Sequence, residues 1–168
     1  MQDEIVNKVE KSGIIQLSMA DFIPSGKRVE LDLKDQLWQG IVLKEKDFRT
    51  WIKENDWSIY KGNFVAVFCS EDAIIPNWAY MLVMSQLVDN AAYTICGDLK
   101  DLEKHVIRKT IETYPTENFQ DERVIIKGCG KPVHEDAWMA FVEKFQPICK
   151  TIMFGEPCST VPVYKRPK

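Results

Sequence analysis

Sulfur chemistry is the most distinctive feature of this sequence. Three of its five cysteines, Cys69, Cys129 and Cys158, stand where an apolar run gives way to a polar loop. Cys129 lies between Gly128 and Gly130, and a glycine on each side lets the backbone expose N–H groups in a small concavity that favours a thiolate. Thiolates from several loops are ligands of zinc and of iron–sulfur clusters. A single activated thiol is also a nucleophile.

Other polar residues of these loops extend the candidate site. Asp72 is either a further metal ligand or the cap of its own loop. Lys127 could stabilise negative charge beside the glycine loop, and Ser159 and Thr160 offer hydroxyl groups that could hold a phosphate or satisfy a turn. His134 opens a predicted helix, and we interpret it as a helix cap in preference to a catalytic base.

The elements that must position these residues alternate along the second part of the chain. Strand-like runs are expected at 63–70, 91–98, 123–130 and 149–156, and helical spacing predicts helices over 44–55, 76–90, 99–114 and 134–146. Short strands are also expected at 13–18, 28–33 and 40–44. Strands that are apolar on both faces and separated by single helices are typical of βαβ units in a buried parallel sheet.

The sequence therefore predicts an α/β fold, a single three-layer domain with a largely parallel sheet. Residues 1–62 form a mixed N-terminal segment, in which antiparallel strands are an option, and residues 63–168 form a βαβ core with a C-terminal tail. Ligands of open parallel sheets bind outside the carboxyl ends of the strands. If the strands are neighbours, the three cysteine loops meet at that edge. Cys96 and Cys149 fall within or at the start of strand-like runs, and we interpret both as core thiols.

Composition excludes several classes of protein. The chain has 168 residues, a net charge of -3 and 45% hydrophobic residues, which fits one globular domain without a basic field for nucleic acid. We interpret its only basic run, 165–168, as a solvated tail. No segment has the apolar length of a signal peptide or membrane span, so we expect a cytoplasmic protein without membrane association. An odd number of cysteines in a reducing compartment argues against a disulfide framework. The sequence also lacks G-x-G-x-x-G, P-loop, H-E-x-x-H and G-x-S-x-G motifs.

Four segments of the sequence resemble a small bacterial family known as domain of unknown function 2480. They are KEKDFR (44–49), CSEDAIIPNWAYML (69–82), KGCG (127–130) and CSTVP (158–162) close to a basic C-terminus. The family has no assigned activity. The resemblance implies an association with the sulfur-mobilisation machinery that assembles iron–sulfur clusters, and thus a thiol site. It covers Cys69, Asp72, Trp78, Lys127, Gly128, Cys129, Gly130, Cys158, Ser159 and Thr160. His134 departs from the family pattern.

Three hypotheses follow. In the first, the protein binds zinc or an iron–sulfur species through Cys69, Cys129 and Cys158 with Asp72, as an accessory to iron–sulfur assembly proteins. In the second, Cys129 is the nucleophile of an enzyme or a persulfide carrier. In the third, the protein is a partner-binding module whose cysteines are packing residues. No C-x-x-C pair is present, and ligands taken one from each loop give no diagnostic spacing, so all three remain open.

Overall fold

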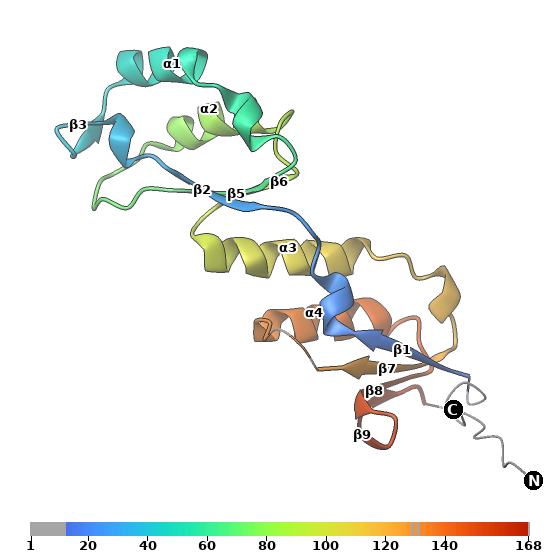
Figure 1. Cartoon of the computed structure of the whole chain (residues 1–168). Helices are drawn as coiled ribbons and strands as arrows, with labels where there is room; N and C mark the ends of the chain where they lie inside the picture. The colour runs from blue at the N-terminus through green and yellow to red at the C-terminus, as the bar shows by residue number, and fades with distance from the viewer. Residues whose placement is uncertain (1–12, 129, 131, 168) are drawn as a thin grey trace, which may run out of the picture. The chain divides into compact units, whose positions relative to one another are not determined.

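The computed structural model describes residues 13–128, 130 and 132–167 (Figure 1). These residues form two compact units, each with its own core. One unit consists of Ser25–Val106, and the other combines the described residues up to Pro24 with those from Ile107 onward. Each unit thus draws on both of the segments, 1–62 and 63–168, that were expected from the sequence. The α/β class and the largely parallel strand arrangement are confirmed.

The unit Ser25–Val106 is built on a three-stranded sheet. The strand order is β2 (Arg28–Asp32), β5 (Phe64–Phe68), β6 (Tyr93–Cys96), and every pair is parallel. Helices α1 (Glu45–Glu54) and α2 (Asn77–Leu87) cover one face, and the first part of α3 (Leu99–Thr113) covers the other (Figure 1). The middle strand is apolar on both faces because both are covered: Val65 and Val67 belong to the cluster under α1 and α2, whereas Ala66 packs with Leu102 and Val106.

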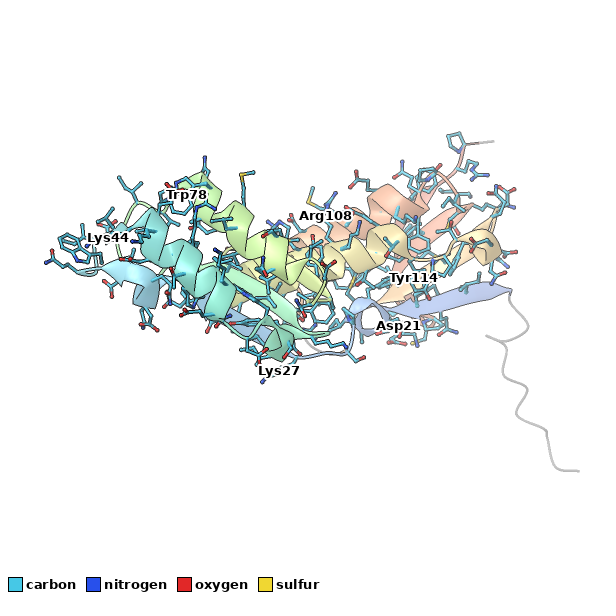
Figure 2. All side chains as sticks on the ribbon, turned by 90° about the horizontal axis from the view of Figure 1, so that it is seen from above. Asp21, Lys27, Lys44, Trp78, Arg108 and Tyr114 are labelled. Carbon is cyan, nitrogen blue, oxygen red and sulfur yellow. The ribbon has the colours of Figure 1, made fainter. Side chains whose placement is uncertain are left out.

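Aromatic contacts and caps fix these helices. Trp78 of α2, labelled in Figure 2, meets Phe48 of α1 edge to face with ring centroids 5.7 Å apart. At the start of α3, Asp98 Oδ1 accepts hydrogen bonds from the backbone N–H groups of Lys100 and Asp101 at 2.8 and 2.9 Å. Asp98 therefore caps the N-terminus of α3. A short antiparallel pair, β3 (Leu37–Trp38) and β4 (Val42–Leu43), completes the unit.

The second unit contains a four-stranded sheet. The strand order is β1 (Ile14–Ser18), β7 (Arg123–Lys127), β8 (Thr151–Glu156), β9 (Ser159–Lys165), and only β9 is antiparallel to its neighbour. Helix α4 (Glu135–Phe145) and the part of α3 from Ile107 onward cover one face, where Phe141 and Phe145 stack with centroids 4.5 Å apart. Within the described ranges no helix covers the opposite face (Figure 1).

Three features differ from the sequence-based expectation. The parallel strands form two sheets instead of one, because β1 pairs with β7 and β2 with β5, and strand patterns in a sequence do not specify strand partners. The N-terminal strands β1 and β2 are parallel to their partners, so the antiparallel option applies only to β3 and β4. Strand β9 was not expected, because the segment after 156 was assigned to a loop and the C-terminal tail. Pro162 is tolerated because β9 is an edge strand and Pro162 pairs with Met153 beside a bulge.

Candidate functional site

Two of the predicted cysteine loops leave the same edge of the four-stranded sheet. Lys127 is the last residue of β7 and Glu156 the last of β8, and Lys127 Nζ lies 2.9 Å from Glu156 Oε2. Each loop carries a cysteine two positions further along the chain. Cys158 is exposed in the connection between β8 and β9, whereas Cys129 lies outside the described residues. The ion pair thus joins the roots of both loops, and we call the residues Lys127, Gly128, Gly130, Glu156 and Cys158 the strand-end site.

Glycine occurs at positions 128 and 130 of this site for two different structural reasons. A Cβ atom on Gly128 would lie 3.0 Å from Cζ of Phe154 and 3.5 Å from Cη2 of Trp138. The rings of Trp138 and Phe154 meet edge to face at 5.4 Å, so a side chain at residue 128 would require the Phe154 ring to shift by a few tenths of an ångström. Gly130 instead has a φ of 134°, a conformation that residues with a side chain rarely adopt.

An apolar cavity adjoins the strand-end site. Its volume is about 330 Å³, and Trp138 and Phe154 line it together with buried residues of β7, β8 and α4. Phe154 is 40% exposed, and Val161 and Val163 on the neighbouring strand are 61% and 49% exposed. The strand-end site therefore combines an ion pair and a thiol with an accessible apolar surface.

Ser159 and Thr160 begin strand β9 directly after Cys158. Their backbones pair with the end of β8, Ser159 opposite Glu156 and Thr160 opposite Gly155. This pairing keeps Cys158 at the tip of a tight hairpin. Gly155 permits the close approach, because a Cβ atom there would lie 2.6 Å from the backbone oxygen of Ser159.

His134 is a helix cap, as predicted. It is the N-cap of α4, and its Nδ1 accepts the backbone N–H of Asp136 at 3.2 Å. This hydrogen bond occupies one ring nitrogen.

The structure assigns Cys69 and Asp72 to the other unit. Cys69 follows β5 and is partly buried, and Asp72 is exposed in the loop before α2. The three-loop site was predicted on the condition that the strands are neighbours, and this condition is not met, because β5 belongs to a different sheet from β7 and β8. The structure pairs Lys127 and Glu156, the strand ends that precede Cys129 and Cys158, whereas Cys69 follows a strand of the other sheet.

Asp32 organises the carboxyl edge of the three-stranded sheet, a role that the sequence did not indicate. Its Oδ1 and Oδ2 accept hydrogen bonds from the backbone N–H and the hydroxyl of Ser70 at 3.0 and 2.6 Å. Burial favours the neutral carboxyl, but the hydrogen bonds from Ser70 and the backbone N–H of Lys34 outweigh it and lower the pKa of Asp32. The sequence shows only that Asp32 ends one predicted strand and that Ser70 follows another, and this does not reveal that the two strands are neighbours.

The remaining cysteines differ from each other. Cys149 is fully buried, and burial raises its pKa to about 11, which confirms a core thiol. Cys96 is exposed at the end of β6, so its interpretation as a core thiol was wrong, because a strand end is less covered than a strand centre. Cys96 lines a cavity of about 190 Å³ with Tyr80, whose pKa is raised by burial and by the thiols of Cys96 and Cys69.

Two further observations bear on the site. Among the residues that the structure describes, no three His, Cys, Asp or Glu side chains are grouped so that they could hold a metal ion. No helix in the described ranges is long and apolar enough to cross a membrane.

The fold and the strand-end site define an α/β protein with thiols at the carboxyl edges of parallel strands. The model of a family described as "Protein of unknown function (DUF2480)" matches residues 3–166, and the chain belongs to this family. This agrees with the resemblance carried by its four sequence segments. No curated protein and no solved structure matches the chain significantly.

Proposed function

We propose that this protein binds a thiophilic metal ion or an iron–sulfur species at the strand-end site, through Cys129 and Cys158, as an accessory to iron–sulfur cluster assembly. The observation that carries the proposal is the 2.9 Å ion pair between Lys127 and Glu156. It joins the roots of the two loops that contain these cysteines.

The chemistry of the donors supports this function. Thiolates prefer zinc, cuprous copper and iron–sulfur clusters over hard cations. Two thiolates leave open positions on a tetrahedral ion, which suits a protein that passes its cargo to a partner. Gly130 has a positive φ, which permits a backbone conformation beside Cys129 that other residues rarely adopt. Cys158 is exposed and therefore accessible to a partner. The accessible apolar surface next to the site offers that partner a contact.

Asp72 and Cys69 take no part in this two-thiol form of the site. They follow β5, a strand of the other sheet.

Metal analysis of anaerobically purified protein tests the proposal. We expect roughly stoichiometric zinc or iron in the wild type, and loss of the metal in Cys129→Ser and in Cys158→Ser, because each variant removes one of only two thiolate donors. Cys96→Ser is the matched control, since it removes an exposed thiol from the other unit.

Two outcomes would contradict the two-thiol site. Protein that stays metal-free after loading with zinc, or with ferrous iron and sulfide, and that keeps its stability in a chelator, has no such site. If Cys69→Ser loses as much metal as Cys129→Ser and Cys158→Ser do, the result would instead support the three-cysteine donor set expected from the sequence.

A further inference from the structure

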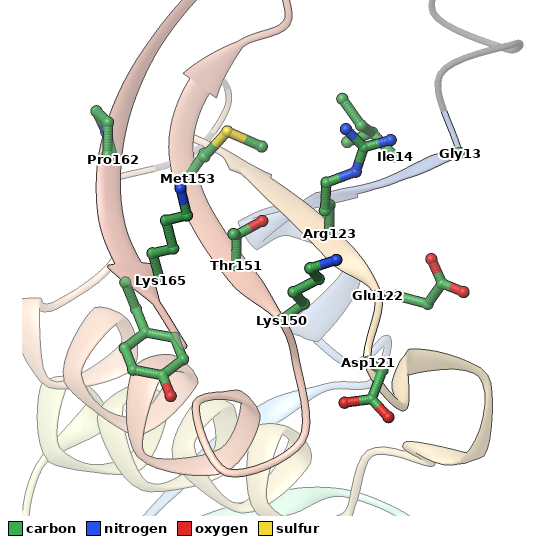
Figure 3. Close-up of a pocket in the computed structure, with 11 residues that line it drawn as sticks. Gly13, Ile14, Asp121, Glu122, Arg123, Lys150, Thr151, Met153, Pro162 and Lys165 are labelled. Atoms are coloured by element: carbon green, nitrogen blue, oxygen red, sulfur yellow. The ribbon is translucent and has the colours of Figure 1, made fainter. Parts of the chain in front are cut away.

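The amino ends of the parallel strands in the same unit enclose an open cavity of about 750 Å³, the amino-edge trough (Figure 3). It is formed where β1, β7 and β8 begin and where β9 ends. The strand-end site lies at the other ends of these strands, so the trough is a separate feature. Its size is within the range of small-molecule sites.

Strand register places one row of side chains on the trough side of the sheet. Ile14 is opposite Arg123, Arg123 opposite Thr151, and Thr151 opposite Lys165. Cross-strand neighbours point to the same face of a sheet. Figure 3 shows the side chains of Arg123, Lys150 and Lys165 reaching to the side on which Met153 and Ile14 lie.

The trough therefore has an excess of positive charge. Two carboxylates lie at its margin, Asp121 and Glu122. Asp121 forms an ion pair with Arg166, which offsets its charge. Within the described ranges no carboxylate lies within 4.0 Å of the ammonium group of Lys150 or Lys165, although the charge of Lys150 also acts on Asp121 at longer range. Neither lysine is held in an ion pair there, so each can donate to an anion.

The hydroxyl of Thr151 lies among the basic side chains of the trough. Thr151 Oγ1 is buried and has no hydrogen-bond partner in the part of the chain that the structure describes. A buried hydroxyl without a partner is costly, and an acceptor atom of a ligand would satisfy it. Ile14, Met153 and Pro162 provide an apolar floor beside it.

We propose that the amino-edge trough binds a small phosphate ester with an apolar body. The phosphate dianion accepts hydrogen bonds from Lys150 and Lys165 and from the hydroxyl of Thr151, and the apolar body covers Met153 and Ile14. Arginine and lysine are the usual partners of phosphate, and the hydroxyl adds a neutral donor. This binding is independent of the strand-end site.

Calorimetric titration with phenyl phosphate tests the proposal. We expect Lys150→Ala and Lys165→Ala each to weaken binding about tenfold or more, because each removes a charge-assisted hydrogen bond. Thr151→Val keeps the shape of the side chain and should weaken binding by about fivefold. Lys46→Ala, an exposed lysine of α1 in the other unit, is the control and should bind as the wild type does.

A methyl NMR signal locates the ligand. The Met153 methyl resonance should shift on titration, whereas Met81 and Met84 of the other unit should not. Unchanged affinity in both lysine variants, or an unmoved Met153 signal, would overturn the proposal. So would inorganic phosphate binding as tightly as phenyl phosphate, because the apolar floor would then contribute nothing. Cys129→Ser should retain binding, which separates this result from that of the metal analysis.

Discussion

The aromatic pair Trp138–Phe154 decides what residue 128 can be. Their edge-to-face contact closes the space above the strand end, and the nearest Phe154 carbon would lie 3.0 Å from a Cβ atom at position 128. The sequence indicated a special role for both glycines around Cys129, and the positive φ of Gly130 fits the freedom expected of it. The reason for Gly128 could not be predicted, because its close contact with Phe154 depends on the pairing of β7 with β8, which the sequence does not specify.

Gly128→Ala tests this packing. We expect a loss of about 1 kcal/mol in the free energy of unfolding, the low end of the cost of an extra methyl group, because the Phe154 ring is 40% exposed and has to shift only slightly. Urea denaturation gives the value. In the double variant Gly128→Ala/Phe154→Leu the smaller side chain should relieve part of the loss. A Gly128→Ala variant as stable as the wild type would contradict the contact.

At the scale of elements, the helices were predictable and the strand partners were not. The helical pattern of Phe48, Trp51 and Ile52 predicted α1 over 44–55, and the structure has it at Glu45–Glu54. The basic run at the C-terminus was interpreted as solvated, yet Lys165 ends β9 and Arg166 donates a hydrogen bond to the Ile148 carbonyl at 2.8 Å. Such contacts depend on a sheet neighbour, which periodicity does not reveal.

The hydrogen bonds of Asp32 connect the end of β2 to the loop after β5, and they predict a pH dependence. Because folding lowers the pKa of Asp32, its ionised form stabilises the fold above the unfolded pKa of about 4, and this contribution is lost as the pH falls through the folded pKa. Asp32→Asn should lower the free energy of unfolding at neutral pH by about 1 kcal/mol, the usual net contribution of a hydrogen bond, because the amide oxygen of asparagine can keep only part of the hydrogen bonds.

Denaturation as a function of pH measures this contribution. The difference between the wild type and Asp32→Asn should shrink as the solution becomes more acidic. Glu71→Gln, an exposed carboxylate in the same loop as Ser70, provides the matched control. A difference that stays constant down to acidic pH would show that Asp32 does not act through its charge.

At the scale of the molecule, the chain builds two cores from interleaved segments. Phe22 from the N-terminal part packs with Phe141 and Phe145, with ring centroids 5.8 and 6.3 Å apart, and the residues between 25 and 106 form the other core. Sequence patterns predicted the α/β class but one sheet, because each βαβ pattern is equally compatible with either arrangement. Whether the three thiol loops meet depended on the strand order, and the structure pairs the strand ends that precede two of them.

The most direct test of the account is therefore the proximity of two thiols. A protein that retains only Cys129 and Cys158, with Cys69→Ser, Cys96→Ser and Cys149→Ala, can be treated with dibromobimane, which bridges only thiols that lie close together. We predict a bridged, fluorescent product in this protein and none in the two variants that retain a single thiol. Modification of Cys129 and Cys158 as two separate, unbridged thiols would contradict a shared site at the strand ends.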